Sequence, residues 1–118
     1  TAALSVKKRS GTLEPFSREK VISGVRKACQ GRPVSSDDLA KLAQQVEENL
    51  RASGKSQIDS HCIGRSILEP LRELDVVAYL RFASVYSSFD DLDDFQTAID
   101  EIRSQQNAAN AATILADQ

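Results

Sequence analysis

A chain of 118 residues is long enough for one compact domain with a single modest core, and it is too short for two. Apolar residues make up 41% of it, with two Tyr, four Phe and no Trp or Met, which favours an aliphatic core between helices. No run approaches the roughly 20 apolar residues that span a bilayer, and the start lacks the pattern of a signal peptide. We therefore expect a cytoplasmic protein without membrane contact.

The net charge of −2 conceals an uneven distribution of charge along the chain. Residues 1–32 carry eight basic and two acidic side chains, whereas residues 90–118 carry one basic and seven acidic side chains. A cationic front end attracts phosphates, and the acidic back end offsets it within the fold or in a neighbouring subunit. The alternative is ordinary solvated surface charge.

The chain opens with the pattern of a β-hairpin. Residues 4–9 alternate as a strand does, Ser10 and Gly11 supply a turn, and residues 12–16 return. Ser17 then has the position of a helix N-cap, and the helix ends before Gly31. Its apolar residues recur at helical spacing: Val21, Ile22, Val25, Ala28 and Cys29.

Two more helices and a short strand are predicted next. Ser35 and Ser36 mark the start of a second helix, which Gly54 ends. An extended piece around Gln57 and Ile58 adds a third strand. Asp59 or Ser60 then caps a third helix, whose inward-facing residues are Ile63, Ile67, Leu68 and Leu71.

The last part of the chain is predicted to be helical. Asp75 caps a fourth helix that extends to about Phe89, and carboxylates over 90–94 begin a fifth, where the positive end of the helix dipole favours them. Residues 104–118 are rich in Ala, Asn and Gln, and they form either a helical extension or a disordered tail. The fold class is therefore α+β, with a hairpin or three-stranded sheet packed on four to five helices.

No catalytic constellation stands out in the sequence. His61 is the single histidine, so a serine triad has one candidate base and a Cys and His metal pair has no second histidine. The carboxylates over 90–94 lack the glycine and distal glutamate of a calcium loop. Cys29 and Cys62 lie in predicted helices and are too few for a four-cysteine zinc site. We expect neither an enzyme nor a metal site in this chain.

The strongest candidate site lies at the N-terminus. Lys8, Arg9 and Glu14 belong to the hairpin, while Lys20 lies in the first turn of the next helix, beside unpaired backbone amides. Lysine supplies a mobile point charge and arginine a planar fork, a combination that suits a triphosphate. An ordinary charged hairpin face is the alternative.

Four aromatic residues follow one another at helical spacing in the predicted fourth helix: Tyr79, Phe82, Tyr86 and Phe89. Such a stripe is typical of a core-facing helix. A tyrosine at its edge can also present its ring to a purine base.

These segments resemble a known family. SVKKRSGTLEPFSREKVISGVRKAC resembles the opening of the ATP-cone domain, a hairpin followed by a helix with an early lysine. GRPVSSDDL, LDVVAYLRFASVYSSF and the aspartate-rich helix after them are similar to the cone of NrdR-type repressors of ribonucleotide reductase genes. The resemblance runs from about Leu4 to Arg103, which predicts an ATP-cone domain over residues 1–103 and a C-terminal tail over residues 104–118.

The resemblance implies a nucleotide-sensing domain of a bacterial transcriptional repressor. It would bind ATP or dATP, with Mg²⁺ as an optional companion, and change its homo-oligomeric state to control DNA binding. Carried over position by position, the nucleotide-binding residues are Val6, Lys8, Arg9, Glu14, Lys20, Val21, Ser60, Gly64 and Tyr86. An arginine that commonly follows the tyrosine in this family is Ser87 here.

The resemblance also implies parts outside this chain. In this family a zinc ribbon with four cysteines precedes the cone, and zinc and DNA contacts are expected there and not in this chain. The start at Thr1 without a methionine favours a fragment. Two alternatives stay open: the allosteric ATP cone of a ribonucleotide reductase enzyme, and a module that only forms oligomers.

Overall fold

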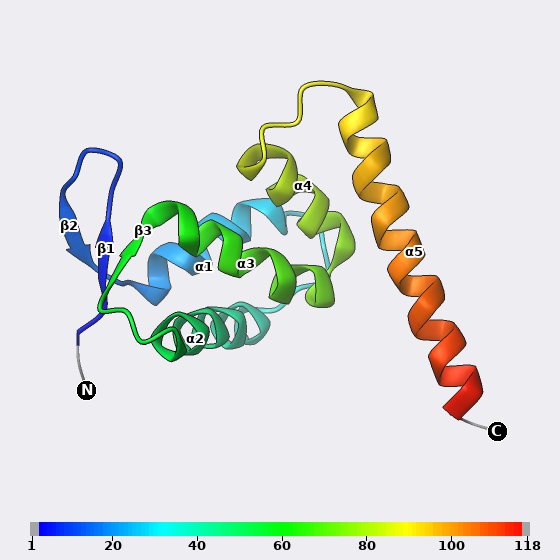
Figure 1. Ribbon diagram of the computed structural model, residues 1–118, viewed down its shortest axis with the longest axis horizontal. Coiled ribbons are helices and arrows are strands. Elements are labelled where there is room, and N and C mark those ends of the chain that lie inside the picture. The colour runs from blue at the N-terminus through cyan, green and yellow to red at the C-terminus, as the bar shows by residue number, and fades with distance from the viewer. Residues whose placement is uncertain (1–2, 117–118) are drawn as a thin grey trace. The chain divides into compact units, whose positions relative to one another are not determined.

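The computed structural model describes residues 3–116, which divide into two compact units at residues 82 and 83, inside α4. Figure 1 shows the order of the elements along the chain. The strands are β1 (Ser5–Lys7), β2 (Leu13–Pro15) and β3 (Gln57–Asp59). The helices are α1 (Arg18–Ala28), α2 (Ser36–Ala52), α3 (Ser60–Leu74), α4 (Val76–Tyr86) and α5 (Leu92–Ala116). The predicted α+β class is confirmed.

The strands form one small mixed sheet in the order β2-β1-β3. β1 pairs with β2 in antiparallel orientation and with β3 in parallel orientation, so that Val6 lies between Glu14 and Ile58. Gly11 has a φ of 89°, a conformation that a residue without Cβ adopts at no steric cost, and its N–H donates to the carbonyl of Lys8 in the hairpin turn. The predicted hairpin and third strand are both present.

The helices α1 and α2 begin at the predicted serines. The Ser17 hydroxyl accepts a hydrogen bond from the Lys20 N–H, and Ser35 exchanges reciprocal bonds with Asp38 in a capping box. Both caps satisfy backbone amides that have no partner within the helix. Gly54, with a φ of 80°, follows the end of α2 as expected. Asp59 occupies the N-cap position of α3, but its side chain makes no capping hydrogen bond.

The core of the first unit is aliphatic and lies between the helices and one face of the sheet. Leu71, Val25 and Val46 are its largest fully buried side chains, and Leu4 and Ile58 connect it to the sheet. The helices α1 and α3 both pack against α2. Because α3 follows β3 directly, its first turns lie beside the sheet (Figure 1).

A carboxylate at the end of α3 links it to the segment that follows α1. Asp75, whose side chain is 7% exposed, accepts hydrogen bonds from the Ala78 N–H at 2.9 Å and from Arg32 Nε at 2.9 Å. It thus caps α4 and pairs with the segment that follows α1. Arg81 adds a second link, since its Nη1 donates to the carbonyl of Gln30 at 2.6 Å.

Replacing Asp75 with alanine is expected to lower the free energy of unfolding by about 1–2 kcal/mol, because α4 loses its cap and Arg32 its partner. Urea unfolding followed by circular dichroism measures the loss. Glu73→Ala is the matched control, since Glu73 carries the same charge, is exposed and lies two residues before Asp75, near the end of α3. Equal losses in the two variants would refute the capping role.

The predicted fourth helix is too long by three residues. α4 ends at Tyr86, and Ser88 has a left-handed φ of 53°. The Phe89 N–H donates to the carbonyl of Ser84, and the Ser88 N–H to that of Val85, which is the Schellman pattern that ends a helix. Phe89 therefore lies outside the predicted aromatic stripe, and its ring meets Phe95 edge to face at 4.9 Å.

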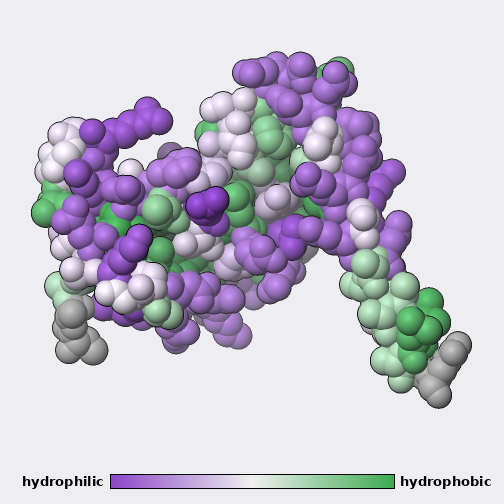
Figure 2. All heavy atoms as spheres, viewed as in Figure 1, coloured by the Kyte–Doolittle hydropathy of each residue, from purple (hydrophilic) through white to green (hydrophobic). Residues whose placement is uncertain are grey.

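The helix α5 starts among the predicted carboxylates. Asp91 Oδ1 accepts from the Asp94 N–H at 3.1 Å, so this carboxylate caps the helix. The helix continues through residues 104–116, and its last turns expose Ile114 and Leu115, which Figure 2 shows as an apolar surface. Within residues 3–116, no helix is long and apolar enough to cross a membrane.

Candidate functional site: a cavity beside two lysines and a glutamate

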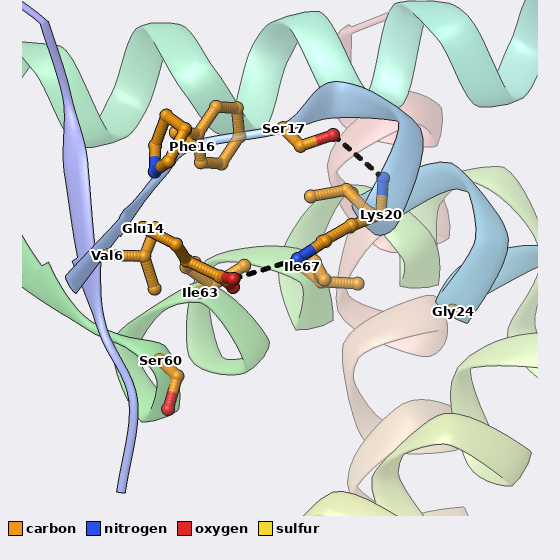
Figure 3. A pocket seen from close by; sticks show the side chains of 11 residues that line it. Val6, Glu14, Phe16, Ser17, Lys20, Gly24, Ser60, Ile63 and Ile67 are labelled. Atoms are coloured by element: carbon orange, nitrogen blue, oxygen red, sulfur yellow. Dashed lines mark hydrogen bonds and ion pairs between the residues drawn. The ribbon is translucent and has the colours of Figure 1, made fainter. Parts of the chain in front are cut away.

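A cavity of about 190 Å³ lies between the sheet, α1 and α3 (Figure 3). Most of its walls are apolar, and its polar groups are the side chains of Glu14, Ser17, Lys20 and Ser60. The apolar walls are Val6, Pro15, Phe16, Val21, Ile63 and Ile67, with Gly24 completing the lining. A mostly apolar cavity with a few converging polar groups is typical of a small-molecule site.

The pairing of the hairpin strands sets which side chains face the cavity. Side chains alternate along a strand, so Val6 and Lys8 lie on the same face of the hairpin. Glu14 is paired with Val6 and therefore shares that face. A backbone hydrogen bond from the Lys8 N–H to the carbonyl of Thr12 continues the ladder to the turn. Lys8 and Glu14 are thus neighbours because of strand register.

One carboxylate oxygen of Glu14 forms ion pairs with two lysine ammonium groups. Glu14 Oε2 lies 3.1 Å from Lys8 Nζ and 2.9 Å from Lys20 Nζ, and Figure 3 shows Lys20 reaching from α1 toward Glu14. Hydrogen bonds from Lys20 and then Lys8 lower the pKa of Glu14 below its ordinary value. The two lysine side chains are half exposed or more, so their ammonium groups remain accessible to a ligand.

The start of α1 adds to the positive potential of this site. The first backbone amides of a helix have no intrahelical partner, and the helix dipole is positive at this end. The Ser17 hydroxyl accepts a hydrogen bond from one of these amides, the N–H of Lys20. Lysine side chains beside a helix N-terminus form a setting in which anions, and phosphates in particular, are bound.

Comparison with known proteins identifies the family. Residues 4–92 match the family described as ATP cone domain. The chain is 66% identical over 117 residues to the transcriptional repressor NrdR of Clavibacter michiganensis subsp. michiganensis, covering 99% of this chain and 72% of that protein. It is also 66% identical over 111 residues to NrdR of Paenarthrobacter aurescens, covering 94% and 67%. The chain belongs to the NrdR family of transcriptional repressors. Its relatives are named as transcriptional repressors and not as enzymes, which confirms the prediction that this chain is not an enzyme.

The structure of this NrdR cone brings most of the predicted site residues together. Five of them line the cavity, namely Val6, Glu14, Lys20, Val21 and Ser60. Lys8 joins them through Glu14. Arg9 lies exposed in the hairpin turn, and Gly64 lies on α3 next to Ile63; neither lines the cavity. Tyr86 ends α4 in the second unit, and its part in the site stays a prediction.

Several cavity residues were not predicted as site residues. Ile63 and Ile67 follow the helical spacing of an inward-facing stripe, which indicates burial but not a cavity. Pro15 ends β2 and Phe16 follows it before α1, and no motif marks either residue. The sequence signal that was available is the position of Phe16 directly before the N-cap Ser17, since an apolar residue there commonly packs against the helix.

The cysteines of the NrdR cone do not suit zinc. Burial, and next the charge of Asp75, raise the pKa of Cys29, which favours the neutral thiol over the thiolate that binds zinc. Cys62 is also a free thiol, on α3. Among the residues that the structure describes, no three His, Cys, Asp or Glu side chains form a metal-binding group.

The stability of the cone is expected to fall in acid. Hydrogen bonds from lysines lower the pKa of Glu14, and a hydrogen bond from Arg18, outweighing burial, lowers that of Glu47. Burial opposes ionisation of Asp75, but bonds from Ala78 and Arg32 outweigh it, so its pKa is also lowered. Carboxyls with lowered pKa values stabilise the fold above their unfolded pKa and lose this contribution as the pH falls through the folded value.

The free energy of unfolding is therefore expected to stay nearly constant from about pH 7 to 6 and to decline below about pH 4. Urea unfolding at stepped pH measures it. The free energy of unfolding of the Asp75→Asn variant should fall less steeply with decreasing pH than that of the unmodified chain, because one of the three carboxyls no longer titrates. A stability that rises on acidification would contradict the lowered pKa values.

Proposed function

We propose that this chain is the nucleotide sensor of a transcriptional repressor of ribonucleotide reductase genes, with ATP and dATP as ligands. The observation that supports it most is the convergence of Lys8 and Lys20 on one oxygen at the wall of an apolar cavity. Two ammonium groups beside a helix N-terminus suit a triphosphate. Membership of the ATP-cone and NrdR families points to the same ligand class.

The cavity suits one part of a nucleotide and not the whole. At about 190 Å³ it is smaller than the roughly 300–1,000 Å³ of a drug-sized ligand pocket. The apolar side chains of Val6, Phe16 and Ile63 provide the contacts that a base or sugar needs, while the charged phosphates would lie outside with Lys8 and Lys20. In the same proposal Arg9, which is exposed in the turn of this hairpin, contacts the end of the triphosphate.

A metal ion has a limited place in this proposal. Glu14 is the carboxylate in the lining of the cavity, and two lysines already neutralise it, so it is a poor ligand for Mg²⁺. We propose that Mg²⁺, where it accompanies ATP or dATP, is held by the phosphate oxygens. Zinc and DNA belong, in the same proposal, to a zinc ribbon outside this chain, and the repressor acts in the cytoplasm.

The proposed switch works through the packing of identical subunits. ATP and dATP differ by one hydroxyl, and either ligand shifts an assembly equilibrium only by its differential affinity for the two assemblies. A difference of about 1.4 kcal/mol changes that equilibrium tenfold. The spacing of the DNA-binding parts would follow from the assembly.

Two measurements on the chain test the proposal. Isothermal titration with ATP, dATP and adenosine measures binding, and mass-resolved sizing without nucleotide, with ATP and with dATP measures assembly. We expect both nucleotides to bind and the mass distribution to differ between them. Absence of binding refutes the sensor function, and a mass distribution that no nucleotide changes favours a module that only forms oligomers.

The allosteric cone of a ribonucleotide reductase enzyme is the second candidate. The same cavity would then regulate catalysis in a larger polypeptide. The names of the relatives favour the repressor, since proteins 66% identical over nearly the whole chain are named as repressors. A reductase would require a catalytic domain in the same polypeptide, which sequencing of the gene around this segment decides.

A further inference from the structure

Glu14 joins the ammonium groups of Lys8 and Lys20. Its Oε2 lies 2.9 Å from Lys20 Nζ and 3.1 Å from Lys8 Nζ. These two ammonium groups are the ones proposed to bind the triphosphate. The ammonium groups are within about 6 Å of each other, because each lies about 3 Å from the same oxygen. Two like charges at this separation repel each other unless an anion lies between them.

Three segments of the chain meet at this carboxylate. Glu14 lies on β2, Lys8 on the turn side of β1, and Lys20 on the first turn of α1. The Glu14 side chain is 24% exposed, whereas those of Lys8 and Lys20 are 50% and 65% exposed. The lysines are therefore reachable from solvent while the anion that joins them is recessed against the cavity wall.

A carboxylate and a phosphate compete for the same donors. Both accept charge-assisted hydrogen bonds from ammonium groups, and a lysine on a flexible stem can exchange one anion for the other. When a site must first give up an internal contact, its apparent affinity is reduced by the fraction of molecules in which that contact is open.

We propose that Glu14 is a built-in competitor of the phosphate chain, which closes the Lys8 and Lys20 pair until a polyphosphate displaces it. This inference rests on the nucleotide-binding function proposed above and deepens it. The carboxylate keeps the two lysines together in the absence of ligand, and it raises the nucleotide concentration at which the sensor responds. Glu14 is thus a residue that sets the threshold of the site.

The first test uses inorganic tripolyphosphate, which has neither base nor sugar for Glu14 to contact. Glu14→Gln keeps the size of the side chain and removes its charge, and we expect it to bind tripolyphosphate about tenfold more tightly than the unmodified chain. Glu19→Gln is the matched control, since Glu19 is an exposed carboxylate next to Lys20 in the first turn of α1. An equal gain in both variants, or no gain in Glu14→Gln, overturns the proposal.

The second test uses the unmodified chain and so does not depend on how the variant folds. The Glu14 carboxyl carbon is titrated by NMR with and without saturating tripolyphosphate. Displacement removes both lysines from the carboxylate, so the pKa of Glu14 is expected to rise toward its ordinary value when the ligand is bound. A pKa that stays equally low shows that the carboxylate remains on the lysines, and it overturns the proposal.

The two proposals fail in different ways. If the unmodified chain binds no ATP or dATP, the nucleotide-sensing function is wrong, whatever tripolyphosphate does. If it binds ATP but Glu14→Gln binds tripolyphosphate no more tightly, only the role of Glu14 as competitor is wrong.

Discussion

Replacing Lys8 and Lys20 together with alanine is expected to weaken ATP binding about 100-fold and to leave adenosine binding within about threefold. Each lysine is expected to contribute about tenfold, because charge-assisted hydrogen bonds to phosphate are among the strongest polar contacts that a protein makes. Adenosine has no phosphate, so its affinity depends on the apolar walls of the cavity, which neither substitution removes. Isothermal titration with both ligands measures the two affinities.

Lys27→Ala is the control for this experiment. Lys27 is exposed in the last turn of α1, so its removal changes the net charge by the same sign without touching the cavity. It should weaken ATP binding by less than about twofold at physiological salt, since exposed charges farther apart than about 8 Å are largely screened. Equal losses of ATP and adenosine affinity in the double variant would contradict the assignment of the lysines to the phosphates.

Replacing Leu71 with alanine is expected to lower the free energy of unfolding by about 2–5 kcal/mol. Leu71 has 0% relative exposure in the core between α3 and the helices beside it. Its truncation removes buried methyl groups and leaves a cavity that the packed neighbours fill only in part. A loss of this size is a large part of the stability of a small domain. Urea unfolding followed by circular dichroism measures it.

The exposed leucine of β2 supplies the comparison. Leu13 is 54% exposed in the same unit, so Leu13→Ala is expected to change stability by less than about 0.5 kcal/mol. Because the chemical change is the same, the difference between the variants isolates burial. Losses of similar size at both positions would show that Leu71 does not lie in the core that the structure describes.

Local signals predicted most of the helix starts correctly. Ser17, Ser35 and Asp75 each cap a helix as the sequence indicates, and in each case the bond joins the side chain to a backbone N–H three residues later. The hairpin turn at Gly11 is of the same kind. Interactions that span three or four residues depend on residue type and spacing alone, so a sequence is sufficient to find them.

The end of α4 shows where local signals fail. Ser88 adopts a left-handed conformation that glycine usually occupies, so the sequence has no marker for a helix end there. The aromatic spacing instead predicted that the helix continues to Phe89. The ring of Phe89, which follows the end of α4, packs on Phe95 of α5, and such a contact with a later helix is not visible in the periodicity of the preceding segment.

For the candidate site, the sequence by itself identified a cationic hairpin and an early lysine in the following helix. Only the tertiary structure decided that Lys8 and Lys20 meet at Glu14, while Arg9 does not line the cavity. It also decided that Ile63 and Ile67 of α3 form a wall of that cavity. The physical reason is that charge and periodicity are properties of one segment, whereas the convergence of side chains depends on strand register and on how helices pack against the sheet.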